Sequence, residues 1–238
     1  MIVLIAGAAF LIGFSKAGVG GTLGPFVTVL VALALPADDT IGLLLPMMIV
    51  ADGFTITVHW RRWDQPILRR LLVAAVVGIA AASLLISSIS EPMLRRVIAV
   101  AMLGFALFFL WNKIPRSTAT TAQRSAWPTG IVAGATSTLA HLGGPPVIAY
   151  LITTDLKPRP LVATTAALFT IVNLFKLPAY LLAGLLDGEL IAETWWTWLA
   201  IPVGVLVGRS VVDRINRLWF ERMTMALLVT GALVLLVT

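Results

Sequence analysis

The chain has 238 residues, of which 59% are hydrophobic and 12% are charged, and it contains no cysteine. Soluble domains have about 25% charged residues, whereas uncharged runs of about 18 or more residues are typical of membrane spans. The sequence therefore predicts an all-α polytopic membrane protein and excludes a disulfide framework or a thiolate metal site. The net charge of +6 is attributed to basic cytoplasmic loops and not to nucleic-acid binding, because no basic patch interleaved with aromatic residues is present.

Four of the predicted apolar segments are too short for a full span, which needs about 20 residues. They form two pairs, joined by the glycine-rich sequences SKAGVGGTLG and AHLGG. Each pair is either one broken helix or a re-entrant hairpin. The chain starts with an apolar segment that has no basic region before it, so we expect a first membrane segment and not a cleavable signal. In chain order the segments are Met1–Phe14, Pro25–Leu35, Ile41–Trp60, Leu71–Ile89, Val97–Trp111, Pro128–Leu139, Pro146–Thr153, Leu161–Leu186, Trp195–Gly208 and Met223–Thr238.

The distribution of lysine and arginine favours two hairpins. With both pairs as hairpins, 13 of the 17 basic residues fall in four loops on one side, which the positive-inside bias places in the cytoplasm. A second pair that crossed the membrane would move the four arginines of 209–222 outside. The arrangement with two hairpins predicts that the N-terminus lies outside. The cytoplasmic loops would be 61–70, 112–127, 154–160 and 209–222.

Each half of the chain then has one hairpin and three spans, so the two halves face opposite ways in the membrane. Inverted repeats of this kind are common in secondary transporters. Two sequence matches support the repeat: GPFV and GPPV begin 120 residues apart, and Asp52 precedes Asn173 by 121 residues. The predicted units are a first repeat, 1–112, with its hairpin at 1–35; a cytoplasmic linker, 113–127; and a second repeat, 128–238, with its hairpin at 128–154.

The hairpin tips are candidate anion sites. The second half-helix of each pair begins with Gly-Pro, and helix N-termini offer N–H donors and partial positive charge to anions. Lys16 has long apolar runs around it, which favours a functional role over snorkelling to an interface. His141 is either a ligand or a neutral side chain that satisfies the backbone. The alternative for small residues spaced by four, such as Gly20 and Gly24, is close helix packing.

Two spans carry further polar residues within apolar sequence. Asp52 and Lys176 are the charged residues inside their spans, and the alternative to a functional role is a mutual ion pair. In the functional interpretation, Lys176 contacts the substrate and Asp52 carries a proton. The residues that share a helix face at i, i+3 and i+7 are Asp52, Thr55 and His59 on one span, and Asn173, Lys176 and Tyr180 on the other.

The sequence does not indicate an enzyme or a cofactor. The glycine-rich string lacks the Gly-Lys-Ser/Thr ending of a Walker A loop and the strand–turn–helix setting of a dinucleotide fingerprint. No carboxylate pair, metal-ligand cluster or nucleophile with a base is apparent.

GFSKAGVGG near the N-terminus and GATSTLAHLGGPPVIAYL past the middle resemble the sulfite exporter TauE/SafE family of membrane transporters. The resemblance covers nearly the whole chain. It implies transport of sulfite, sulfonates or sulfoacids across a prokaryotic inner membrane. The matching positions are Gly13, Ser15, Lys16, Gly18, Gly20 and Gly21, then Gly143, Gly144, Pro145 and Pro146.

The sequence thus predicts a secondary transporter for a small sulfur-containing anion, with a site in the middle of the bilayer, protons as a candidate coupling ion, and alternating access between its repeats. An uncoupled anion channel is the alternative, and a structural membrane subunit is disfavoured by the buried charges. Asp52 is the candidate for proton coupling or ion pairing. The candidate substrate ligands are Ser15, Lys16, Gly18, Gly20, Gly21, His141, Gly143, Gly144, Asn173 and Lys176.

Overall fold

The computed structural model describes residues 1–86 and 119–211, together with single positions or pairs between 89 and 107 and residue 229. These residues form helices joined by short turns, and no strand occurs among them. The described part contains five stretches that are long and apolar enough to cross a membrane, which confirms the predicted all-α membrane fold. They are Ile2–Val19, Ala37–Val58, Gln65–Ile86, Pro158–Leu182 and Gly188–Val211.

Several predicted segments lie outside the described residues. The span Met223–Thr238 lies almost entirely outside them, as does Val97–Trp111. So do residues 113–118 of the predicted linker and 212–222 of the last predicted loop.

The first helix is longer than the sequence predicted. α1 runs over Ile2–Val19, so its predicted end at Phe14 is wrong, and at 18 residues it is not too short for a span. Two of its glycines, Gly13 and Gly18, face the backbone of α10 (Ala200–Val211) closely, and this tertiary packing overrides their low helix propensity. The turn begins at Gly20, which adopts φ +65°, a left-handed conformation that favours glycine. After the turn, α2 covers Gly24–Ala32.

The second pair repeats this arrangement with a longer first helix. α6 spans Ala119–Ala140 and includes Pro128, at which the sequence predicted it to begin, and α7 spans Gly144–Leu151. The turn between them has the same hydrogen bond as the first turn, 121 residues later. In the first turn the N–H of Gly21 donates to Ser15 O at 2.9 Å, and in the second the N–H of Leu142 donates to Thr136 O at 3.1 Å.

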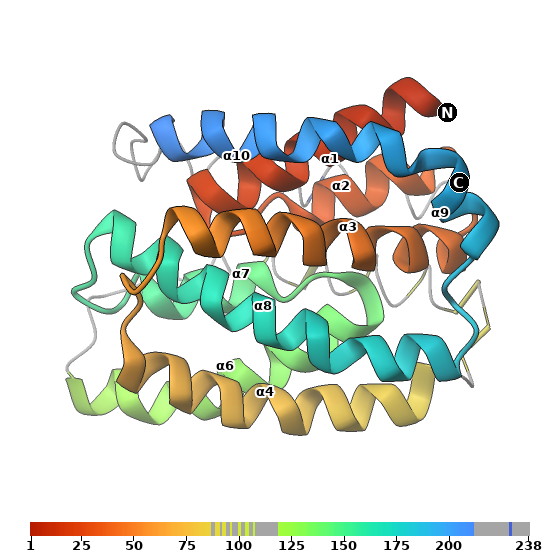
Figure 1. Cartoon of the computed structure of the whole chain (residues 1–238). Helices are drawn as coiled ribbons and strands as arrows, with labels where there is room; N and C mark the ends of the chain where they lie inside the picture. Colours follow the sequence, from red (N-terminus) through yellow and green to blue (C-terminus); the bar gives the residue numbers. More distant parts are fainter. Residues whose placement is uncertain are drawn as a thin grey trace.

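The other described helices agree with the predicted spans to within a few residues, with two exceptions. The helix predicted to begin at Leu71 begins at Gln65, and the stretch predicted to begin at Trp195 begins at Gly188. The latter stretch starts there because the Asp187 side chain caps it, accepting from the backbone N–H groups of Glu189 and Leu190. The elements are α3 (Ala37–Val58), α4 (Gln65–Ile86), α8 (Pro158–Leu182), α9 (Gly188–Thr194), a 3₁₀ turn (Trp195–Leu199) and α10 (Ala200–Val211). In Figure 1, α2 runs back towards the end of the molecule at which α1 begins, while α7 runs back towards the opposite end.

The most extensive helix contacts join α1 to α10 and α4 to α6. Both depend on glycines that admit the backbone of the facing helix. A Cβ on Gly13 of α1 would overlap Ile201 O of α10, and one on Gly134 of α6 would overlap Ala75 O of α4. Since Gly134 lies 121 residues after Gly13, this contact also recurs at the offset of the two turns. The first helix of each predicted repeat therefore packs against a helix of the other.

Candidate functional site

The two glycine-rich turns meet, which brings the starts of α2 and α7 together. A Cβ on Gly24, the first residue of α2, would lie 3.0 Å from His141 O, and one on Gly144, the first residue of α7, would lie 2.6 Å from Gly21 O. The hydroxyl of Thr28 also donates to Ala140 O at 3.4 Å. Each half-helix therefore begins against the turn of the other pair, with a proline at its start.

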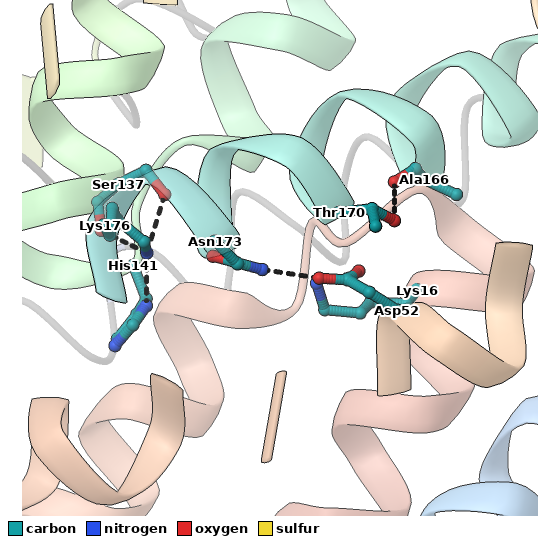
Figure 2. A network of polar contacts seen from close by, with 8 residues as sticks. All are labelled: Lys16, Asp52, Ser137, His141, Ala166, Thr170, Asn173 and Lys176. Carbon is teal, nitrogen blue, oxygen red and sulfur yellow. Dashed lines mark hydrogen bonds and ion pairs between the residues drawn. The ribbon is translucent and has the colours of Figure 1, made fainter. Parts of the chain in front are cut away.

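A buried ion pair lies beside these turns. The Lys16 ammonium of α1 donates to Asp52 Oδ1 of α3 at 2.5 Å, and the Asn173 amide of α8 donates to Asp52 Oδ2 at 2.6 Å (Figure 2). Asp52 and Asn173 are each 1% exposed, and Lys16 is 8% exposed. The Asp52 carboxylate thus joins Lys16 of the first helix to the amide of Asn173, which lies 121 residues after Asp52.

Lys176 occupies a second polar cluster, one turn along α8 from Asn173. Its Nζ lies 3.0 Å from Ser137 O, 3.2 Å from Ser137 Oγ and 3.1 Å from His141 Nδ1 (Figure 2). His141 Nε2 lies 2.9 Å from Ile41 O, and a carbonyl oxygen only accepts. His141 is therefore a neutral imidazole with its proton on Nε2, and Nδ1 accepts from Lys176. The three donors of a Lys176 ammonium then match its three acceptors.

This pairing overturns one alternative from the sequence. A mutual ion pair between Asp52 and Lys176 is wrong, because Asp52 pairs with Lys16 and Lys176 contacts neutral acceptors. The sequence could not decide this, since both lysines fall in apolar segments and the choice depends on how the helices pack. The role of Ser137 was also missed. Its position, 121 residues after Lys16, is the signal that could have found it.

A small cavity of about 30 Å³ lies between the two turns and the polar clusters. Such a volume is large enough to hold water. Three apolar side chains that sequence reasoning did not select, Ile12, Met48 and Phe169, form part of its wall. The remaining lining residues are Ser15, Lys16, Gly21, Gly24, Ser137, His141, Gly144 and Asn173.

Six of the ten predicted ligands thus line one cavity, and the other four lie nearby without lining it. Gly18 packs closely against the backbone of Gly208, and Gly143 against the ring of Phe169 and the backbone of Ala133. Gly20 forms the left-handed turn. Lys176 stands behind Ser137 and His141, which separate it from the cavity.

Basic side chains also gather at one end of the helices. Arg62, from the first predicted cytoplasmic loop, lines a surface concavity of about 460 Å³ together with Lys157 and Arg159 from the third. The two loops therefore lie side by side, as their predicted common side requires. Across the residues that the structure describes, no group of three or more His, Cys, Asp or Glu side chains is placed to hold a metal ion.

The apolar helices, with polar side chains buried among them, define a polytopic helical membrane protein. The model of the sulfite exporter TauE/SafE family matches residues 5–235, and the chain belongs to this family. It is therefore a membrane transport protein, and the family implies sulfur-containing anions as its substrates. No curated protein and no solved structure matched the chain.

Proposed function

We propose that the protein is a secondary transporter that binds a small sulfur-containing anion in the cavity between the two turns and moves it by alternating access. The observation that carries this proposal is the cavity itself. Lys16 offers a cation and Asn173 an amide, and two helix N-termini start at Gly24 and Gly144. These are the groups that stabilise an anion away from bulk water.

The recurrence of contacts at an offset of 121 residues supports alternating access. The same turn hydrogen bond and the same glycine contact occur in both halves, and the cavity lies between the turns. Transporters built from inverted repeats bind their substrate at the repeat interface and expose it to each side by rocking one repeat against the other. We place the two turns at the tips of re-entrant hairpins in the middle of the bilayer.

Anion binding by purified protein tests the site. We expect sulfite, thiosulfate or a small sulfonate to raise the unfolding temperature, and a double variant, Lys16→Met with Asp52→Asn, to abolish this shift. The double variant removes both charges together, because one left alone would be buried without a partner. Lys157→Met is the matched control, since Lys157 is exposed and lies outside the cavity. Unchanged affinity in the double variant would show that the cavity is not the binding site.

An uncoupled channel is the alternative, and transport in proteoliposomes separates the two. A carrier shows saturation and counterflow, in which unlabelled anion inside drives the uptake of labelled anion. A channel shows electrical conductance without counterflow.

A further inference from the structure

The buried polar residues around the cavity carry an unbalanced charge. Within residues 1–86 and 119–211, one carboxylate, Asp52, contacts a lysine of this network, and it pairs with Lys16. Lys176 is fully buried and contacts neutral acceptors. We take Lys176 as an ammonium because its Nζ lies within hydrogen-bond distance of three acceptors. Counted in this way, the described part of the network holds one positive charge more than its negative charge. An uncompensated buried charge is costly, so an anion with a single negative charge would neutralise the network as it stands.

Lys16 stands between the carboxylate and the cavity. Lys16 and Asn173 line the cavity, whereas Asp52 lies behind them and uses one oxygen for each. An anion in the cavity can reach the ammonium of Lys16 directly. The positive charge of Lys16, however, is already balanced by Asp52. A second negative charge on the anion would be compensated only if Asp52 became neutral.

Resting on the proposed function, we infer that the protein couples protons to its substrate according to the charge of the anion. A divalent anion binds together with one proton more than a monovalent anion of the same size, and Asp52 holds that proton. In this step a proton from solution forms an O–H bond with the Asp52 carboxylate. The Lys16 ammonium then forms its ion pair with the anion in place of Asp52, and no other covalent bond changes. Release of the anion reverses both changes.

Asp52 is the group that takes up the extra proton, because none of its neighbours around the cavity can do so favourably. Lys16 from α1 and Lys176 from α8 are both counted as ammonium groups that donate to acceptors, and Asn173 from α8 does not titrate. His141 is the remaining titratable neighbour of the cavity. Its Nδ1 accepts from Lys176 and its Nε2 donates to Ile41 O, so protonation would replace a hydrogen bond by repulsion between two cations.

Sulfate and methanesulfonate are the probes that test this inference. They have nearly the same tetrahedral shape, and at neutral pH sulfate carries two negative charges and methanesulfonate one. Sulfite is unsuitable because it titrates near neutral pH itself. Proton uptake on binding is measured with purified protein in weakly buffered detergent solution containing a pH indicator. We expect sulfate to cause the uptake of one proton more than methanesulfonate does. Equal uptake for the two anions would overturn the inference.

Asp52→Asn assigns the proton. The asparagine has the shape of the protonated carboxyl group, and we expect the difference in proton uptake between the two anions to disappear in this variant. A difference that persists would place the proton elsewhere and overturn the assignment. A second measurement needs no variant: the affinity ratio of sulfate to methanesulfonate rises tenfold for each unit by which the pH falls, over the range where free Asp52 is ionised. A constant ratio contradicts the inference. If neither anion binds the wild-type protein, the proposed function fails as well.

Discussion

At the scale of single residues, one carboxylate organises the polar centre, because Asp52 accepts hydrogen bonds from Lys16 and from Asn173. Lys16, Asp52, Asn173 and Lys176 were selected from the sequence because ionisable and amide side chains are costly within apolar segments. Which lysine meets Asp52 depends on how three helices pack, and no spacing in the sequence encodes that. Ser137 was overlooked because a serine is common in membrane helices and carries no such cost.

The turn residues show a second limit at this scale. Gly20 and His141 lie 121 residues apart and have nearly the same backbone conformation, with φ of +65° and +55°. A glycine adopts it without strain, whereas a histidine is uncommon there and costs about 1–3 kcal/mol of backbone strain. The strained residue is the one that accepts a hydrogen bond from Lys176. The sequence aligned the two turns, but it did not indicate that a histidine takes the place of a glycine.

Lys176→Met is expected to separate stability from binding. Methionine has a similar length and no charge to desolvate, but it leaves Ser137 Oγ and His141 Nδ1 without the Lys176 donor. Because these two changes oppose each other, we expect the free energy of unfolding to stay within about 1–2 kcal/mol of wild type. The loss of a positive charge beside the cavity should weaken anion binding tenfold or more, which corresponds to at least about 1.4 kcal/mol. Thermal unfolding and titration calorimetry measure the two effects. A variant that binds as tightly as wild type would contradict the role given to Lys176.

At the scale of elements, helix ends were the least predictable feature. The sequence ended the first helix at Phe14 because a glycine-rich string follows, yet the helix continues to Val19. Glycine disfavours an isolated helix, but here the missing side chains let α10 approach, and that packing stabilises the extra turn. The start of α6 was missed for a related reason. Pro128 is a common first residue of a helix, and the structure places it inside one.

Two glycines of α1 provide a matched test of this packing. A Cβ on Gly13 would overlap the α10 backbone, whereas one on Gly7 has nothing within 4 Å. We expect Gly13→Ala to destabilise the protein by about 1–3 kcal/mol, because two backbones must separate. Gly7→Ala should be neutral or stabilise it by about 0.5–1 kcal/mol through better helix propensity. Chemical denaturation in mild detergent compares the two, and similar losses in both would argue against close packing of α1 on α10.

At the scale of the whole molecule, the charge count in the loops predicts on which side of the membrane each loop lies. This prediction depends on many residues, so it tolerates errors at helix ends. The concavity lined by Arg62 and Lys157 brings together two loops that the count had placed on one side. The count cannot give the depth of the turns in the membrane, since that depends on which helices tilt and pack.

Single cysteines can test this topology, because the chain has none of its own. Asp155 lies in the predicted cytoplasmic loop 154–160. Glu189 lies in the connection 187–194, which the same charge count places outside, and both side chains are exposed. We expect a membrane-impermeant maleimide to label Glu189→Cys in intact cells, and to label Asp155→Cys only after the membrane is opened. The reverse pattern, with Asp155→Cys labelled in intact cells and Glu189→Cys labelled only after the membrane is opened, would contradict the second hairpin.

The packing of α1 on α10 also has a consequence for biosynthesis. The ribosome makes α1 first and α10 near the end, and at about 5–20 residues per second the two are separated by roughly 10–40 s. During that interval the glycine face of α1 has no partner, although Asp52 of α3 already neutralises Lys16. The Lys16–Asp52 pair can therefore form early in synthesis, whereas the packing of α1 is completed only after α10 has been made.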